Sequence, residues 1–495
     1  MPDTTIELHT PTVDGRDVDF HWTVDPPSDI YRSNSFRLRF PESIDISAIP
    51  ERLWWTVFLL CVHSHWTVMR PCTVRLPVEL PVEEIDFWQR LLETYVATAE
   101  AQRDGDRYER DIDIVSSGRR MEPIAPPPER GIFAAAFSGG KDSLVQAEIL
   151  YELGHDPILV ATTSLLPGLV DHSTRHRRRT FDEIQKRRGA RLVEVESDLR
   201  SAWDNGGASR QGYPFGINEI GDTFLYTAVL VAVGYAMGAT HLYLASENEV
   251  SENHIESGRF MQHPHFMYSA TTQGAIRALL EPTGMYFGSL ISSLHSSQVQ
   301  ELLTTRYRDV RDLQFSCWRT TEERRACSEC SECKRLGWIA MSLGESPSDL
   351  GIDLVHMLTN YDDPERASKV HTYPPSAAVS ARMRAQMTRA IAGVSFGRVF
   401  WHVIREHPKA LLQRRGWRAM GRFNRLRKEA RERGHAEAPG YRAGFLETLD
   451  PAIRAEVGAI FDEHFGREPE ASYIEQLDRQ RKVIEHITAP LRRRS

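Results

Sequence analysis

No stretch of this 495-residue sequence reaches the roughly 20 consecutive apolar residues that are needed to cross a bilayer. The longest apolar runs, 53–62 and 224–237, are shorter, so we expect buried helices and no membrane span. The start of the chain also lacks a basic segment followed by an apolar one, the pattern of a secretory signal, and we expect a cytoplasmic protein. A net charge of −7 argues against a protein coated by nucleic acid.

Cysteine is scarce, with six residues in the whole chain, which excludes a disulfide scaffold. Cys61 and Cys72 stand alone and are expected to be small buried side chains. The other four lie in one short segment, at Cys317, Cys327, Cys330 and Cys333. Clustered thiols with two-residue spacers are typical of structural zinc. An iron–sulfur run would need a cysteine where Gly337 stands, and a redox pair is a further alternative, so zinc is the favoured interpretation.

The chain lacks the Walker pattern G-x-x-x-x-G-K-[ST], so a kinase-type phosphate loop is excluded. In its place an apolar run, 131–136, leads into Phe137-Ser138-Gly139-Gly140-Lys141-Asp142-Ser143-Leu144 and then into a helical pattern. Adjacent glycines let the backbone turn sharply beside an anion, and the start of the helix supplies free N–H donors. We therefore predict that these eight residues bind the phosphates of a nucleotide.

Hydrophobic periodicity divides the chain into three expected parts: an α+β domain over 1–122, an α/β core over 130–345 and a helical extension over 346–495. A proline cluster at 123–128 marks the first boundary. In the core, strands are predicted at 132–137, 157–162, 191–196 and 241–245, with helices at 142–153, 173–188 and 219–237. Alternating strands and helices indicate a parallel sheet, whose ligands bind at the carboxyl ends of the strands.

Two further features have alternative interpretations. The basic stretch 405–433 is either a solvated helix face with Trp417 and Phe423 turned to the core, which we favour, or a surface for RNA or an acidic partner. Four histidines and the basic run 175–179 are taken as surface or packing features rather than a second metal site. The histidines are His172, His176, His263 and His265.

The sequence Ser-Gly-Gly-x-Asp-Ser resembles the signature of the PP-loop ATP pyrophosphatases, and residues 131–345, with the cysteine segment, resemble 7-cyano-7-deazaguanine synthase. The resemblance implies a PP-loop fold, ATP and Mg²⁺ at the glycine loop, and Zn²⁺ on the four cysteines. It also implies that the carboxylate of 7-carboxy-7-deazaguanine is adenylated, with release of pyrophosphate, before an amine displaces AMP. Lys141, Asp142 and Ser143 are the expected catalytic residues.

The chain departs from the family where Val-Pro-Gly-Arg-Asn is usual, because Pro214-Phe215-Gly216-Ile217-Asn218 has no arginine. Synthesis of the nitrile from ammonia is therefore the alternative. Relatives with added domains resemble anti-phage components that attach a deazaguanine to a partner protein, so we expect a C–N ligase with a protein acceptor docked on the N- or C-terminal extension. Expected substrate contacts are Asn218, Glu247 and Asn248.

Two other functions remain open. One is PP-loop tRNA thiolation, which the absence of cysteine between Cys72 and Cys317 disfavours. The other is a non-catalytic nucleotide-binding subunit. A nucleic-acid partner is accordingly not favoured.

Overall fold

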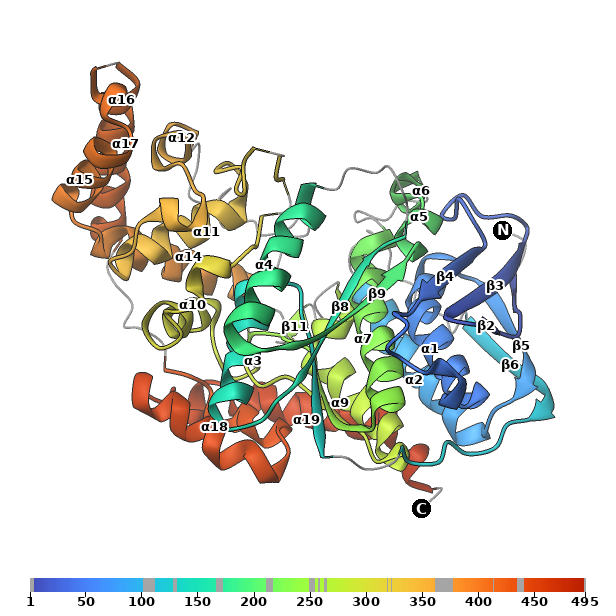
Figure 1. The fold of residues 1–495 in the computed structure, drawn as a ribbon. Helices are drawn as coiled ribbons and strands as arrows, with labels where there is room; N and C mark the ends of the chain where they lie inside the picture. The colour runs from blue at the N-terminus through green and yellow to red at the C-terminus, as the bar shows by residue number, and fades with distance from the viewer. Residues whose placement is uncertain are drawn as a thin grey trace.

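The structure is a computed structural model of the chain. It describes residues 4–100, 112–127, 131–165, 172–210, 217–248, 254–256, 259–261, 265–317, 319–321, 323–360, 377–412, 414–433 and 440–493. One long mixed sheet crosses the body of the molecule, helices cover its faces, and a helical arm extends from one side (Figure 1). No described helix combines the length and apolar character needed to cross a membrane.

Five strands at one end of the sheet are parallel to one another. They are β7 (Ile132–Ala136), β8 (Ile158–Ser164), β9 (Arg191–Ser197), β10 (Ala239–Tyr243) and β13 (Tyr286–Gly288). Their spatial order is β13-β10-β7-β8-β9, so the direction of winding reverses between β7 and β10. The predicted α/β class and the four predicted parallel strands are confirmed. In such sheets the ligand crevice lies outside the carboxyl ends of the strands at this switch point.

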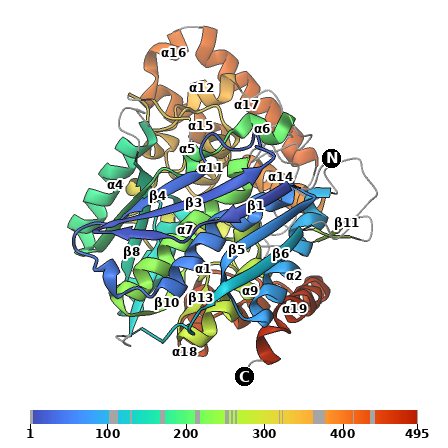
Figure 2. The ribbon, with the colours of Figure 1, turned by 90° about the vertical axis from the view of Figure 1, so that its right-hand side faces the viewer.

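The N-terminal strands continue the same sheet, and Figure 2 looks onto this half. They are β1 (Thr4–Leu8), β2 (Thr12–Asp14), β3 (Asp17–Asp25), β4 (Ser35–Arg39), β5 (Cys72–Glu79) and β6 (Ile112–Arg120). The two halves join where β4 pairs antiparallel with β9, at Leu38 opposite Ser197. The Arg37 N–H also donates to Asp198 Oδ1 over 2.6 Å. The sheet therefore crosses residue 122, and the domain division proposed there stays a prediction.

The core also extends across both halves of the sheet. Helix α1 (Glu51–Val62) is buried along almost its whole length because nearly every residue in it is apolar. It packs against α7 (Ile217–Met237), the long apolar helix of the parallel half. One apolar cluster consequently runs from Ile6 to Phe287 and also includes Ile487. The other helices of the body are α2 (Val82–Glu100), α3 (Lys141–Glu152), α4 (His172–Arg188), α5 (Leu199–Ala202), α6 (Asn205–Arg210), α9 (Ala270–Leu280) and α10 (Ser296–Thr305).

The helices after residue 330 form two groups, and only the first has an apolar cluster of its own, because the second packs into the clusters of the body. The first surrounds the cysteines with one apolar cluster. Its helices are α11 (Ser331–Ser342), α12 (Leu354–Thr359), α14 (Ala377–Gly393), α15 (Phe396–Glu406), α16 (Pro408–Leu412) and α17 (Arg414–Glu432). The second, α18 (Pro451–His464) and α19 (Ile474–Thr488), returns to the body, where α19 packs on α9 and α2. Phe423 is fully buried as expected, but the expectation for Trp417 is wrong, because its side chain is 59% exposed.

Candidate functional site

The glycine loop forms a strand–turn–helix between β7 and α3. Gly139 has a φ of +77°, and a Cβ there would lie 3.0 Å from Thr180 Cγ2, so both conformation and space require glycine. Gly140 is the N-cap of α3. The Ser143 hydroxyl donates to the Gly140 carbonyl over 3.1 Å and accepts from the Ser138 N–H over 3.3 Å. These bonds hold the loop closed at the start of the helix.

A pocket of about 80 Å³ opens beside this loop, at the carboxyl ends of β7, β8 and β10. This volume is smaller than that of most small-molecule sites, which range from about 300 to 1,000 Å³. Its walls are both polar and aromatic. They comprise Ala136, Phe137, Ser138, Asp142, Ser143, Val160, Thr162, Arg177, Phe181, Tyr226, Leu244, Ala245 and Tyr268. Four residues of the predicted loop therefore reach the pocket, at the switch point of the sheet.

Other predicted residues lie elsewhere. Leu144 is fully buried in the apolar core. Asn248 is held by the 289–295 segment, since its N–H donates to the Leu294 carbonyl over 2.8 Å and its side-chain amide to the Ser292 carbonyl over 3.2 Å. Asn218 belongs to α7, but its side chain, like 214–216 and His263, lies outside the described part of the chain.

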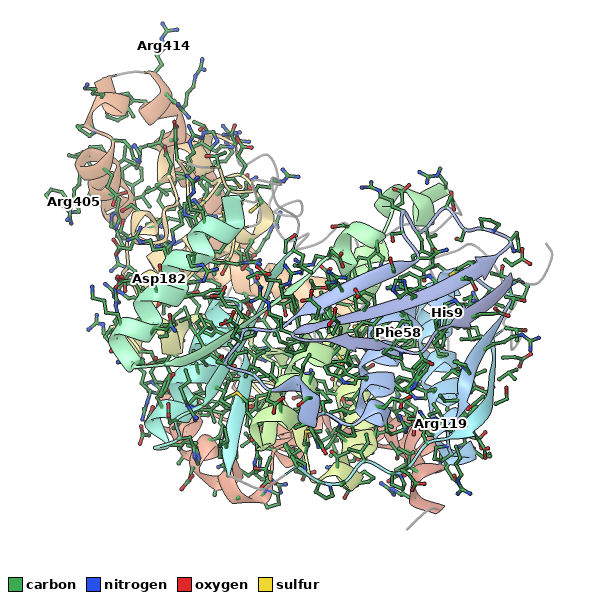
Figure 3. The ribbon with its side chains drawn as sticks, turned by 45° about the vertical axis from the view of Figure 1, so that its right-hand side comes forward. His9, Phe58, Arg119, Asp182, Arg405 and Arg414 are labelled. Atoms are coloured by element: carbon green, nitrogen blue, oxygen red, sulfur yellow. The ribbon has the colours of Figure 1, made fainter. Side chains whose placement is uncertain are left out.

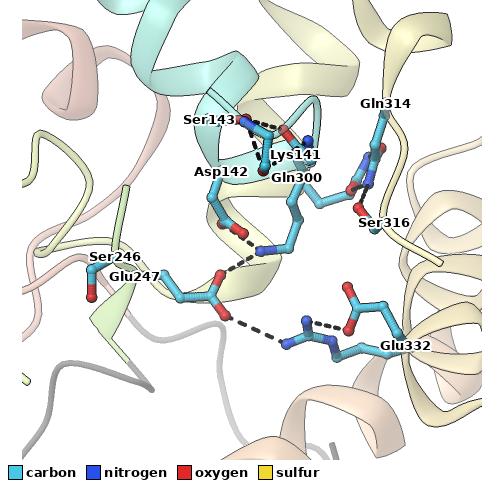
Figure 4. Close-up of polar contacts among 12 residues, drawn as sticks. Lys141, Asp142, Ser143, Ser246, Glu247, Gln300, Gln314, Ser316 and Glu332 are labelled. Carbon is cyan, nitrogen blue, oxygen red and sulfur yellow. Dashed lines mark hydrogen bonds and ion pairs between the residues drawn. The ribbon is translucent and has the colours of Figure 1, made fainter. Parts of the chain in front are cut away.

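Lys141 and Glu247 meet in a buried ion network beneath the pocket (Figure 4). Lys141 Nζ lies 2.5 Å from Asp142 Oδ1 and 2.5 Å from Glu247 Oε2. The second oxygen of Glu247 lies 3.6 Å from Arg335 Nη1, and Arg335 Nη2 lies 2.7 Å from Glu332 Oε2. We call these five residues the Lys141 network. Only Asp142 among them also lines the pocket.

Charge and burial shift the pKa of two groups in this network. Burial lowers the pKa of Lys141, but the nearby Asp142 and Glu247 carboxylates outweigh burial, so the net shift is upward and the amine stays protonated. Burial raises the pKa of Asp142, and the charge of Glu247 raises it further, against the attraction of Lys141. An ionised Asp142 is therefore unfavourable by itself, and a cation placed beside it would relieve that cost.

Sequence reasoning missed the most telling residue of the pocket, Arg177. It comes from α4 and lines the pocket, yet its Nε is buried and has no hydrogen-bond partner in the described structure. The nearby Asp222 carboxylate instead accepts from Arg200 Nε over 2.8 Å. A buried donor without a partner is unfavourable unless a ligand supplies an acceptor. The helical spacing of Arg177 and Phe181, which puts both on one face of α4, was the available signal.

The four clustered cysteines come together as predicted. Their Sγ atoms all lie within 4.8 Å of one another, and Cys327 Sγ lies 3.9 Å from Cys333 Sγ. A tetrahedral ion with bonds of about 2.3 Å separates its sulfurs by about 3.8 Å. Backbone N–H groups also point at the sulfurs, among them those of Cys327, Glu329, Cys330 and Cys333. The cluster therefore has the donors and the spacing to hold a metal ion.

Several contacts fasten this cysteine segment to the glycine loop. The Phe315 N–H donates to the Gly139 carbonyl over 2.8 Å, and the Thr180 hydroxyl donates to the Leu313 carbonyl over 2.7 Å. Glu332 lies between two of the cysteines, and Arg335 follows the last one by two residues. The Lys141 network thus connects the pocket to the helix that begins at the cysteine cluster.

Comparisons with families of known proteins, with curated protein sequences and with solved structures found no match. The fold and the site define the class: an α/β protein with a pocket at the switch point of its parallel strands and a four-cysteine cluster joined to that pocket.

Proposed function

We propose that this chain is an ATP-dependent C–N ligase of the PP-loop type. The observation that carries the proposal is the position of the glycine turn. It lies at the switch point of the sheet, with Ser138, Asp142 and Ser143 in the wall of the pocket. The start of α3 offers N–H donors to phosphate, and Arg177 offers an Nε–H that has no hydrogen-bond partner in the described residues.

The residues present also fit Mg²⁺, which neutralises phosphate charge when it is bound with ATP. Asp142 is the carboxylate that would hold it, since burial and the charge of Glu247 raise the pKa of Asp142 despite Lys141, and a bound cation would offset both. Lys141 keeps its proton, and its ammonium group forms ion pairs that hold the carboxylates of Asp142 and Glu247 in place. The chain's own contribution is thus to bind and orient the phosphates.

The proposed reaction has two steps. A carboxylate oxygen of 7-carboxy-7-deazaguanine attacks the α-phosphorus of ATP, and the bond to the leaving pyrophosphate breaks. An amine nitrogen then attacks the acyl carbon, loses a proton and expels AMP, which leaves an amide. The aromatic rings of Phe181, Tyr226 and Tyr268 give the pocket walls that suit flat heterocycles.

The acceptor in this proposal is an amine on a partner protein, in a bacterial anti-phage setting and in the cytoplasm, where free thiols persist. Ammonia, with the nitrile as product, is the alternative acceptor. Of the predicted substrate contacts, Glu247 pairs with Lys141 and Asn248 donates to the Ser292 carbonyl, and their contact with substrate stays a prediction.

We further propose that the four cysteines hold Zn²⁺. Four thiolates close a tetrahedral site, so the ion would be structural and would supply folding stability rather than a reactive water. Metal analysis of the purified protein tests this assignment. One zinc per chain supports it, whereas iron with inorganic sulfide would favour tRNA thiolation.

The decisive experiment measures pyrophosphate release with ATP, Mg²⁺ and 7-carboxy-7-deazaguanine. Release should depend on the acid and disappear in Asp142→Ala. Arg177→Gln should lower it by about 10- to 100-fold, while the matched variant Arg179→Gln, exposed on the same helix, should not change it. Mass spectrometry of small products and of co-expressed proteins then identifies the acceptor. Release no higher than with ATP alone would overturn the deazaguanine assignment and favour a non-catalytic nucleotide-binding subunit.

A further inference from the structure

The helical arm ends in a surface that the proposed reaction does not use. Helices α15, α16 and α17 lie at the extremity of the molecule, away from the N-terminal strands (Figure 1). Figure 3 shows Arg405 and Arg414 projecting outward from this end. Because the end stands clear of the body, its side chains are available to another molecule.

Large apolar side chains gather on this surface. Of the seven that are exposed in the described residues, four lie here: Phe396, Trp401, Ile404 and Trp417. Trp401 is 61% exposed and Trp417 is 59% exposed. Phe400 links Phe396 to Trp417, with its ring centroid 6.2 Å from that of Phe396 and 6.3 Å from that of Trp417. We call these five residues the tip patch. Contiguous exposed apolar surface of this kind marks an interaction site.

The charge around the tip patch selects the partner. Between residues 396 and 428 the sequence has ten Lys or Arg and one acid, Glu406, in a chain whose net charge is −7. The Glu406 carboxylate accepts from the hydroxyls of Ser346 and Ser348, and a single acid among ten cations leaves this surface strongly positive. A second copy would bring the same cations against these, so a symmetric dimer through the patch is unfavourable. The complementary partner is acidic.

Two helix glycines lie beside the exposed rings of the tip patch. Gly397 lies four residues before Trp401, and Gly421 lies four residues after Trp417, so each shares a helix face with an exposed ring. A Cβ at either glycine would meet nothing within 4 Å. The chain's own packing therefore does not require glycine there. The surface beside each ring is therefore open. Exposed rings among arginines are complementary to a protein segment that carries both apolar side chains and carboxylates, whereas a phosphate backbone supplies no apolar side chains.

We propose that the tip patch binds an amphipathic helical segment of another protein, with apolar residues that cover the exposed rings and carboxylates that face the arginines. Trp401 and Trp417 are its anchors, since tryptophan and arginine dominate binding energy at protein interfaces. Arg405, Arg414 and Arg418 form the rim on both helices of the patch. This inference is independent of the chemistry in the pocket.

The test uses the full chain and a fluorescent synthetic peptide of about 18 residues, with leucine at helical i, i+3, i+4 and i+7 positions and glutamate elsewhere. Fluorescence anisotropy should show salt-sensitive binding, about tenfold weaker for a scrambled peptide of the same composition. The double variant Trp401→Ala/Trp417→Ala and the variant Arg414→Glu/Arg418→Glu should each weaken binding by at least about tenfold. Val82→Ala, a matched change at an exposed residue of α2, should have no effect.

Gly421→Leu separates the proposed partner from the alternatives. The leucine would occupy the open space beside Trp417 and should weaken binding of the peptide, but it adds apolar surface and should strengthen binding to vesicles of anionic phospholipid. Equal binding of the ordered and scrambled peptides, or peptide binding unchanged by Gly421→Leu, would overturn the proposal. So would tighter binding of anionic vesicles or single-stranded poly(U) RNA that depends on the same tryptophans. Circular dichroism of each variant confirms that the fold is retained.

Discussion

Two buried groups of charges in this molecule are built differently. In the N-terminal half, Arg52 of α1 pairs with Glu84 of α2, and each is also held by a neighbour: Arg52 donates to Thr56 over 3.2 Å, and Trp88 donates to Glu84 over 3.4 Å. This pair has one charge of each sign. The Lys141 network has two cations and three carboxylates, and Asp142 brings it to the wall of the pocket. The Arg52–Glu84 pair is neutral overall and gains nothing from a further ion. The Lys141 network has one more carboxylate than it has cations, so a cation that comes with a ligand would neutralise it.

The first test asks whether the Arg52 pair is only structural. Arg52→Met should lower the free energy of unfolding by about 3–5 kcal/mol, because it leaves the Glu84 carboxylate buried without its cation. The double variant Arg52→Met/Glu84→Leu should recover to within about 1–2 kcal/mol of the parent chain. Urea unfolding measures both, and pyrophosphate release should remain normal in the folded double variant. Equal losses in the single and double variants would contradict this view of the pair.

The same substitutions in the Lys141 network should give the opposite result. Lys141→Met should lower pyrophosphate release by about 100-fold, because Asp142 and Glu247 would lose the ammonium that positions them. Adding Glu247→Leu should restore stability without restoring activity. Thermal unfolding and steady-state kinetics of the two variants separate these effects. Recovery of activity in the double variant would mean that this network, too, is only structural.

A smaller loss of activity is expected from a change at Arg335, which belongs to the Lys141 network but does not line the pocket. Arg335→Gln removes the cation that joins Glu247 to Glu332 but leaves all four thiols in place. We expect normal metal content and about tenfold slower turnover, because Glu247 would hold Lys141 less firmly. Arg335→Lys should recover part of the loss. If Arg335→Gln released the metal, the activity change would report on the cysteine cluster instead.

The difference between the two groups also explains what the sequence could and could not predict. The glycine loop and the cysteines were recognisable because their chemistry lies in short, contiguous patterns. Four parallel strands followed from apolar runs that alternate with helices. By contrast, Arg335 and Lys141 are almost 200 residues apart and meet only because the cysteine segment is tied back to Gly139. The join between β4 and β9 depends on the pairing of distant strand edges, which local periodicity does not encode.

Exposure was equally hard to predict. The run of arginines around Trp417 suggested a solvated face with the ring turned inward, because tryptophan is usually buried. The structure places Phe423 in the core and leaves Trp417 outside. A sequence pattern alone does not distinguish an apolar helix face that is buried within the same chain from one that stays exposed for another protein.

The last prediction concerns the one network carboxylate that lines the pocket. The pKa of Asp142 is raised in the folded chain, so between its ordinary pKa and the raised value the folded state keeps a proton that the unfolded state releases. Stability should therefore fall as pH rises through this window. Asparagine cannot ionise, so Asp142→Asn should melt about 1–3 °C higher than the parent chain at pH 8, with a smaller difference at pH 5.5.

Mg²⁺ with ATP should reverse that order, because it stabilises an ionised Asp142 but gains little from the amide. Thermal melts of both proteins at the two pH values, with and without Mg²⁺ and ATP, measure all of these differences. Lower stability of Asp142→Asn at pH 8 without ligand would mean that the attraction of Lys141 outweighs burial. The network would then be balanced like the Arg52 pair, and the raised pKa would no longer support a cation beside Asp142.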